Sequence, residues 1–304
     1  MVYYSFAMPP NGMLIPLMAG LTLSSMALIQ AHKGSKGHES IAEAERAFSK
    51  RCGEVGIKKS FLENFHSRGV FFSPKPGFAA DDLKNQPDDV LPLTTVLEWA
   101  PAVVDVSAAG DMGYTTGPLK IRAADDSRPP SFGQYFSVWI REKDTAPWKV
   151  ILDFGTRTKT GGQEPRTIKY QAAPQAEPNS RPGASSNEIN EAERRFADAA
   201  ESALPSSVLR THSDPNVRLH RDGFDPILGI EAAESYYKAY DKVTHWLPMG
   251  SGISASGDMG YSYGRYSVES AGKPTSGYFA RVWKRDRNGA WKIVADIANV
   301  EKNP

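Results

Sequence analysis

Side chains suited to acid–base chemistry gather toward the end of this 304-residue chain. Arg218 and His220 alternate along a strand-like segment, and Asp296 ends another such segment near the C-terminus. Histidine exchanges protons near neutral pH, and a carboxylate withdrawn from water can act as a base. If His220 and Asp296 meet at the wall of a cavity, together they can move a proton on a bound carbonyl compound. We therefore predict His220 and Asp296 as candidate catalytic residues.

Aromatic side chains are spaced so that they can line the same cavity. Tyr237 and Tyr240 fall on one face of a predicted helix, and Tyr261 and Tyr263 share one face of a predicted strand. Such side chains offer a ligand both flat apolar surfaces and hydrogen-bond donors. The predicted ligand-binding residues are Arg218, Tyr237, Tyr240, Trp246, Tyr261 and Tyr263.

Composition and motifs argue against metal, cofactor and nucleic-acid chemistry. Cys52 is the single cysteine, so the chain cannot form an internal disulfide or a thiolate metal site. The sequence lacks the His-x-His, His-Glu-x-x-His, Gly-x-Ser-x-Gly and phosphate-binding glycine motifs. The formal net charge of +1 creates no field that would attract nucleic acid. We predict no metal, no cofactor and no nucleic-acid partner, and a small molecule as the ligand.

A long internal repeat defines the organisation of the chain. The segment Gly110–Tyr114 (GDMGY) returns as Gly257–Tyr261, 147 positions later. Further blocks recur in the same order, including an Ala-Glu-Arg helix segment, a Val-Trp pair and a Trp-Lys strand segment. A repeat of this length indicates a duplicated domain rather than a short solenoid unit.

Differences between the two copies indicate where a site has developed. Aligning residues 70–73 with residues 217–220 keeps one strand face apolar and changes the other face to Arg218 and His220. Strand alternation then places Asp296 on the face opposite Trp291, where it can line a cavity. The alternative is that Arg218 and His220 lie outside the sheet toward solvent, which leaves a pocket that only binds.

Each copy opens with helical periodicity and continues with alternating, strand-like segments. This order predicts an α+β domain with helices on one face of a bent antiparallel sheet. The predicted domains span residues 38–157 and 189–304. Residues 158–188 contain four prolines and no apolar periodicity, which is typical of a linker.

The N-terminal segment is typical of a secretory signal peptide. Residues 13–31 carry no charge, are rich in leucine and methionine, and end in small-residue motifs. We predict a signal peptide at residues 1–31, export to the periplasm or the medium, and no integral membrane segment after its removal. The alternative is an uncleaved membrane anchor, because no basic residue precedes the apolar run.

The repeated phrases Ser256–Gly264 (SGDMGYSYG) and Gly289–Ile297 (GAWKIVADI) resemble the SnoaL-like branch of the nuclear transport factor 2-like superfamily. The resemblance covers both halves and implies two cone-shaped domains, each with a curved antiparallel sheet wrapped around N-terminal helices. Members of this superfamily include ketosteroid isomerase, scytalone dehydratase, polyketide cyclases and domains that only bind ligands. The resemblance therefore implies a pocket for a small apolar or aromatic molecule. The alternative is a cofactor-free isomerase, cyclase or dehydratase that uses a His/Asp pair. Such cones associate through the outer sheet face, which allows a pseudo-dimer within the chain or a homodimer.

Overall fold

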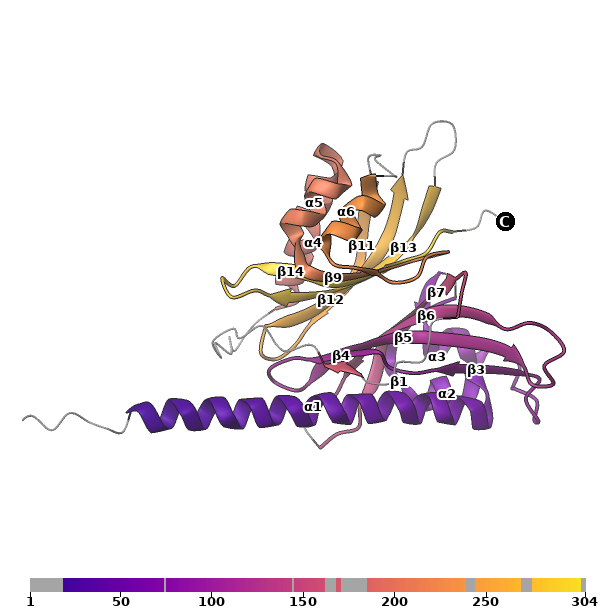
Figure 1. Cartoon of the computed structure of the whole chain (residues 1–304). Coiled ribbons are helices and arrows are strands. Elements are labelled where there is room, and N and C mark those ends of the chain that lie inside the picture. Colours follow the sequence, from indigo (N-terminus) through magenta and orange to yellow (C-terminus); the bar gives the residue numbers. More distant parts are fainter. Residues whose placement is uncertain are drawn as a thin grey trace, which may run out of the picture.

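Two sheets, each with its own helices, make up the chain (Figure 1). The computed structural model describes residues 19–73, 75–143, 145–161, 168–170, 185–238, 244–268 and 275–301. The part up to Tyr170 is called the first domain below, and the part from residue 185 onward the second domain. Helices precede most of the strands in both, so the predicted α+β class and the two copies are confirmed.

The first domain places three helices against an eight-stranded sheet. Its helices are α1 (Ala19–Val55), α2 (Ile57–Asn64) and α3 (Ala79–Lys84). Its strands are β1 (Phe65–Phe72), β2 (Pro76–Phe78), β3 (Thr95–Trp99), β4 (Val103–Val106), β5 (Met112–Ala123), β6 (Ser131–Ile140), β7 (Lys149–Thr158) and β8 (Lys169–Tyr170). The strand order is β2-β1-β7-β6-β5-β4-β8, and β3 also pairs with β5. The β8 strand lies within the predicted linker, so part of that segment belongs to the first sheet.

The second domain repeats this plan with a six-stranded sheet. Its helices are α4 (Asn187–Ser202), α5 (Pro205–His212) and α6 (Ile230–Lys238). Its strands are β9 (Ser213–Arg221), β10 (Ile227–Leu228), β11 (Thr244–Ile253), β12 (Met259–Val268), β13 (Thr275–Arg285) and β14 (Trp291–Ala298). The strand order is β10-β9-β14-β13-β12-β11, with β9 parallel to β14.

The concave face of each sheet is covered by helices. In the second domain α4 presents Ile189 and Phe196 at helical spacing, and both pack into one core with Trp283 and Ile293. In the first domain Ile41 and Phe48 of α1 pack in the same way against Trp139. Trp139 and Trp283, the tryptophans of the repeated Val-Trp pair, are both fully buried in these cores.

A β-bulge in β14, and another in its counterpart β7, changes which side chains face the helices. The register between β13 and β14 shifts, so that Ile293 lies opposite Trp283 whereas Ala295 lies opposite Val282. One extra residue, Val294, interrupts the alternation, and Asp296 consequently faces the same concave side as Trp291. The prediction that Asp296 lies opposite Trp291 is therefore wrong. The register between β6 and β7 shifts at the matching place and turns Asp153 to the concave side of the first sheet.

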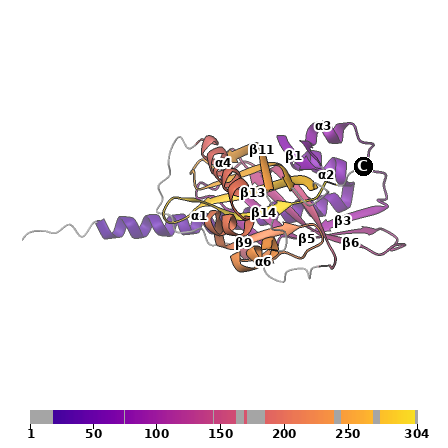
Figure 2. The same ribbon diagram turned by 90° about the horizontal axis from the view of Figure 1, so that it is seen from above.

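The convex faces of the two sheets pack against each other and form a third core (Figures 1 and 2). The first domain contributes Val70, Phe72, Val103, Met112, Tyr114, Phe136, Val138, Ile151, Leu152 and Phe154. The second domain contributes Met259, Tyr278, Ala280, Val282, Val294, Ala295 and Ile297. Burial of this apolar surface on both sides joins the two domains into one packed unit.

The two GDMGY turns meet across this interface and exchange hydrogen bonds. The Ala108 amide donates to Asp258 Oδ2 (3.0 Å), and the Ala255 amide donates to Asp111 Oδ2 (2.8 Å). These bonds are reciprocal, because each joins an amide of one copy to the repeated aspartate of the other. The domains therefore pack as a pseudo-dimer within one chain.

The N-terminal helix α1 begins at Ala19, so its first part falls within the predicted signal peptide. Residues 1–18 lie outside the described residues. Among the described residues, none of the helices combines the length and apolar character that crossing a bilayer requires.

Candidate functional site

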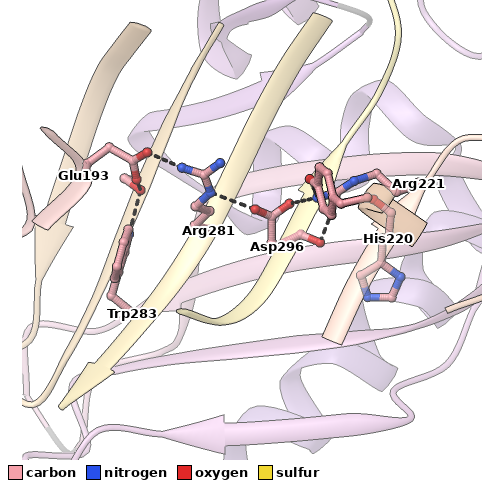
Figure 3. Close-up of polar contacts among 8 residues, drawn as sticks. Glu193, His220, Arg221, Arg281, Trp283 and Asp296 are labelled. Carbon is pink, nitrogen blue, oxygen red and sulfur yellow. Dashed lines mark hydrogen bonds and ion pairs between the residues drawn. The ribbon is translucent and has the colours of Figure 1, made fainter. Parts of the chain in front are cut away.

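A buried arginine occupies the concave face of the second domain. Arg281 on β13 forms ion pairs with Glu193 on α4 and, at 2.7 Å from its Nε, with Asp296 on β14. All three side chains are withdrawn from solvent. Figure 3 shows the guanidinium of Arg281 between the two carboxylates. A buried charge requires such paired, hydrogen-bonded partners to remain ionised.

Three aromatic rings enclose the same guanidinium. Its central carbon lies 4.1 Å from the ring centroid of Phe196, 4.1 Å from that of Trp246 and 4.4 Å from that of Phe279. These distances are within the range of cation–π attraction. The arginine thus fills the space between α4 and the sheet, where we expected a ligand.

Asp296 is neutralised a second time by an arginine of the first strand of this domain. Arg221 on β9 approaches Asp296 Oδ1 at 2.6 Å and donates a hydrogen bond of 2.6 Å to the Tyr237 hydroxyl. Burial raises the pKa of Asp296, but the charges of Arg221 and Arg281 outweigh burial and hold that pKa below its usual value. A carboxylate held in this way is a poor proton acceptor at neutral pH.

His220 lies on the other face of the sheet from Asp296. In the parallel register of β9 and β14, Leu219 is beside Asp296 and His220 is beside Ile297. Its Nε2 lies 2.9 Å from Thr116 Oγ1 of the first domain, and its ring points away from Asp296 in Figure 3. The predicted catalytic pair is therefore wrong, because neighbouring strands place the two side chains on opposite faces.

Other predicted site residues divide between the same two faces. Trp246 and Tyr237 lie on the concave side of the second domain, as expected. Tyr261 and Tyr263 pack against the interdomain core, where the ring centroids of Phe72 and Tyr263 lie 6.0 Å apart. Tyr240 lies outside the described residues.

Arg218 also lies at the interdomain face, and its Nε is 3.3 Å from His220 Nε2. Arg218 and His220 do lie on the outer face of the sheet, as the alternative prediction stated. His220 is covered there by the first domain rather than by solvent. Burial lowers the pKa of His220 well below its usual value, and the nearby charges of Arg218 and Arg221 lower it further. This histidine is neutral in the folded protein.

The alignment of residues 70–73 with residues 217–220 is wrong by one position. Val70 pairs with Leu152 on β7, just as Arg218 pairs with Ala295 on β14. Residues 70–72 therefore correspond to 218–220, a shift of 148 rather than 147. The opening helices carried this signal, because Glu45 already matches Glu193 at 148.

The concave face of the first domain holds two carboxyl groups without an arginine. Glu45 on α1 accepts hydrogen bonds from the Trp99 indole, the Thr115 hydroxyl and, at 2.8 Å, the Trp139 indole. Asp153 on β7 accepts one of 2.7 Å from the Ser137 hydroxyl. Among the side chains that the structure describes, neither carboxyl forms an ion pair.

The pKa values of these acids reflect the missing cation. Burial raises the pKa of Glu45 to about 7, although hydrogen bonds from Thr115 and Trp99 lower it in part. Burial also raises the pKa of Asp153 to about 7, against the lowering effect of the Ser137 hydrogen bond. Acids of this kind can take up or release a proton near neutral pH.

This face is also more open than its counterpart. Asp153 is half-buried and the neighbouring Gly155 is exposed, whereas Asp296 in the second domain is fully buried. Phe71 and Trp99 are half-buried beside it. Tyr135 is only 5% exposed, and its hydroxyl has no hydrogen-bond partner among the described residues. The candidate functional site is therefore this face, formed by Glu45, Phe71, Trp99, Tyr135, Ser137 and Asp153.

Sequence reasoning missed this site because it searched for added polar residues. The informative difference is the absence of a charged residue in the first domain. Ser137 lies across from Asp153, whereas Arg281 lies across from Asp296 at the corresponding position of the second domain. The repeated Val-Trp pair that follows each of these residues could have revealed the exchange, because Val138 aligns with Val282.

Three solved structures that are similar to this chain each match about two fifths of it. A ketosteroid isomerase-like protein from Erwinia carotovora atroseptica is 11% identical with a TM-score of 0.35, and the match covers 40% of this chain and 99% of that chain. An NTF-2 like protein of unknown function from Shewanella oneidensis is 13% identical with a TM-score of 0.33, covering 37% and 97%. An NTF2-like protein from Cytophaga hutchinsonii is 14% identical with a TM-score of 0.32, covering 38% and 97%. No family model matches the sequence, and the search of curated proteins found no match.

Proposed function

We propose that the concave face of the first domain binds a small apolar or aromatic molecule. The observation that carries this proposal is the Tyr135 hydroxyl, which is buried and, although it is near Thr115, makes no hydrogen bond of normal geometry among the described residues. Leaving such a group unsatisfied costs about 1–3 kcal/mol, and a ligand acceptor removes that cost. Asp153, half-buried on the same face, offers a second polar contact.

An aromatic wall supplies the apolar contact surface. The ring centroid of Phe61 lies 5.3 Å from that of Phe71 and 6.4 Å from that of Trp99, and both pairs have edge-to-face geometry. Phe71 and Trp99 are only half-buried, so they retain surface for a ligand. Small-molecule sites typically combine such apolar walls with a few fixed polar groups.

A second candidate function is cofactor-free proton transfer on a bound carbonyl compound. It is favoured by the pKa of about 7 at Asp153, because a general acid–base group works best when its pKa is near the ambient pH. In this reading Asp153 moves the proton and Tyr135 donates a hydrogen bond to the substrate oxygen. The original His220 and Asp296 pair has no part in it.

Titration of the full chain with a neutral aromatic probe, 2-naphthol, tests the binding proposal. We expect Tyr135→Phe to weaken binding about five- to tenfold, the effect of one lost hydrogen bond in a buried site. The matched control is Tyr278→Phe on the corresponding strand of the second domain, where the ring faces the interdomain core. Absence of saturable 2-naphthol binding, or equal effects of the two substitutions, contradicts the proposal.

We also propose that the protein is exported, with residues 1–31 removed as a signal peptide. The uncharged stretch at residues 13–31 supports export. Cleavage near His32 would shorten α1 without removing Ile41, whose burial anchors this helix on the sheet. The domain can thus keep its core after processing.

A further inference from the structure

The second domain contains a bound cation of its own, the side chain of Arg281. Its guanidinium contacts two carboxylates, Glu193 and Asp296, and is enclosed by three aromatic rings. This arrangement is how proteins commonly hold planar organic cations, with charge at the edge and π surfaces on the faces. Here the cation is tethered to the sheet that binds it.

The first domain has the same set of groups around the corresponding position. Glu45 and Asp153 match the two carboxylates, and the repeat aligns Phe48 with Phe196 and Trp99 with Trp246. Tyr135 takes the place of Phe279, because each lies two residues before the residue that faces the aspartate. Ser137 stands in place of the arginine, and its hydroxyl reaches only Asp153.

We propose that the candidate site of the first domain binds an organic cation, a guanidinium, amidinium or amine carried on a flat apolar group. This inference rests on the proposed binding function and specifies the chemical class of the ligand. The cation takes the role that Arg281 has in the second domain. Its N–H groups donate to Asp153 and to the Tyr135 oxygen, which can accept as well as donate, while the aromatic rings of Phe71 and Trp99 cover its apolar part.

Hydrogen-bond capacity agrees with a cation that binds mainly at Asp153. Glu45 already accepts three hydrogen bonds, so it contributes negative charge rather than a free acceptor. Among the described residues Asp153 accepts one hydrogen bond, from Ser137, whereas a carboxylate has about four lone-pair positions. A cationic donor therefore finds unused acceptor positions in a region where no described arginine or lysine pairs with either acid.

Two probes of the same shape separate charge from shape. Benzamidine carries a planar cation on a phenyl ring, and benzamide is its neutral counterpart. In calorimetric titrations of the full chain at pH 8, we expect benzamidine to bind at least tenfold more tightly than benzamide. Equal binding of the two, or tighter binding of benzamide, overturns the cation inference but leaves the proposed binding function standing. Absence of binding by both probes and by 2-naphthol overturns both proposals.

A substitution that rebuilds the second-domain arrangement shows where the probe binds. Ser137→Arg places a tethered guanidinium opposite Asp153, and we expect it to reduce benzamidine affinity at least tenfold. The matched control is Ser276→Arg, on the corresponding strand of the second domain but at its partly exposed end, which should leave the affinity unchanged. Unchanged benzamidine affinity in a folded Ser137→Arg variant means that the probe binds elsewhere and overturns the inference. The wild-type comparison of benzamidine with benzamide decides the charge preference even if the variant does not fold.

Discussion

Ser137 and Arg281 hold the same position in the two sheets, Ser137 directly across from Asp153 on β7 and Arg281 directly across from Asp296 on β14. In the second domain the pair is an ion pair of 2.7 Å, and in the first it is a neutral donor at 2.7 Å from a carboxyl. The residue at this position thus distinguishes the two domains. The second has a closed interior with paired charges, and the first has a more open face whose acids form no ion pair among the described side chains. The following predictions test this division and the interface that joins the domains.

Removing Arg281 should destabilise the second domain strongly. Arg281→Ser leaves Glu193 without its cation and Asp296 with Arg221 alone, and we expect a loss of about 3–5 kcal/mol in the free energy of unfolding. Urea unfolding measures it. The control is Arg265→Ser on β12, where the pair with Glu301 is exposed and should contribute less than about 1 kcal/mol. Similar effects of the two substitutions would show that the buried network has no special role.

Glu45 should make the first domain less stable as the pH rises. Its folded pKa of about 7 lies above the ordinary value of 4.5, so between these pH values the folded state holds a proton that the unfolded state has lost. Stability falls across this window, by about 3 kcal/mol in total, and stays low above pH 7. Glu45→Gln, which mimics the protonated acid, should remove this contribution in urea unfolding from pH 4 to pH 8, while the contribution of Asp153, whose pKa is also raised to about 7, remains. An unchanged pH profile would contradict the assignment.

His220, which lies at the interface between the domains, should make the protein less stable as the pH falls, the opposite of the effect of Glu45. Its folded pKa lies well below the usual 6.5, so its contribution is intact above pH 6.5 and is lost as the pH falls and the unfolded state takes up a proton. Between pH 7 and pH 5 the wild type should lose about 2 kcal/mol of unfolding free energy relative to His220→Phe. Phenylalanine is chosen because Phe72 holds the corresponding position. A difference that does not vary with pH would sink this prediction.

A buried ion pair crosses the interface and should couple the two domains. Lys284 Nζ lies 2.7 Å from Asp105 Oδ2, and both side chains are almost fully buried. Lys284→Met removes the lysine from Asp105 and leaves this buried carboxylate with His38 and the Val106 amide, and we expect a loss of about 3 kcal/mol. Adding Asp105→Asn should recover most of this loss, which a double-mutant cycle in urea unfolding measures. Strictly additive effects would mean that the pair does not link the domains.

Export is tested at the N-terminus of the protein recovered from an expressing bacterium. We expect the mature chain to begin near His32 and to appear outside the cytoplasm. N-terminal sequencing of fractionated cells gives the answer directly. Intact Met1 in the soluble cytoplasmic fraction argues against export, and intact Met1 in the membrane fraction favours the uncleaved anchor.

Repetition within the sequence was sufficient to predict the fold class and the two copies. The GDMGY turns and the strand tryptophans recur at nearly constant spacing, and each copy needs its own core to bury them. The aspartates of the two turns accept hydrogen bonds from backbone amides, as aspartates in turns commonly do. Their partners lie in the other domain, which local sequence cannot reveal.

The sequence pattern alone could not predict the face of the sheet on which each candidate residue lies. A bulge at Val294 adds one residue without any change in composition, and it reverses the side to which Asp296 points. The interdomain contact has a similar effect, because Arg218 and His220 look like residues of a solvent-facing or cavity-facing strand until the first domain covers them. Arg281 was visible as a charged residue in a strand, but its partner Asp296 becomes apparent only from the register of β13 and β14.

The reciprocal hydrogen bonds of Asp111 and Asp258 have a consequence for how such a protein can change over evolutionary time. In a dimer of identical subunits every substitution occurs twice, so a lysine at the interface also appears in the other subunit and an arginine that fills one pocket fills both. Covalent linkage of the copies removes this constraint. Lys284 needs only one Asp105, and Arg281 can pair with the acids of one domain while Ser137 leaves those of the other without a cation. Fusion thus lets one domain specialise as scaffold while its twin remains free to acquire ligands.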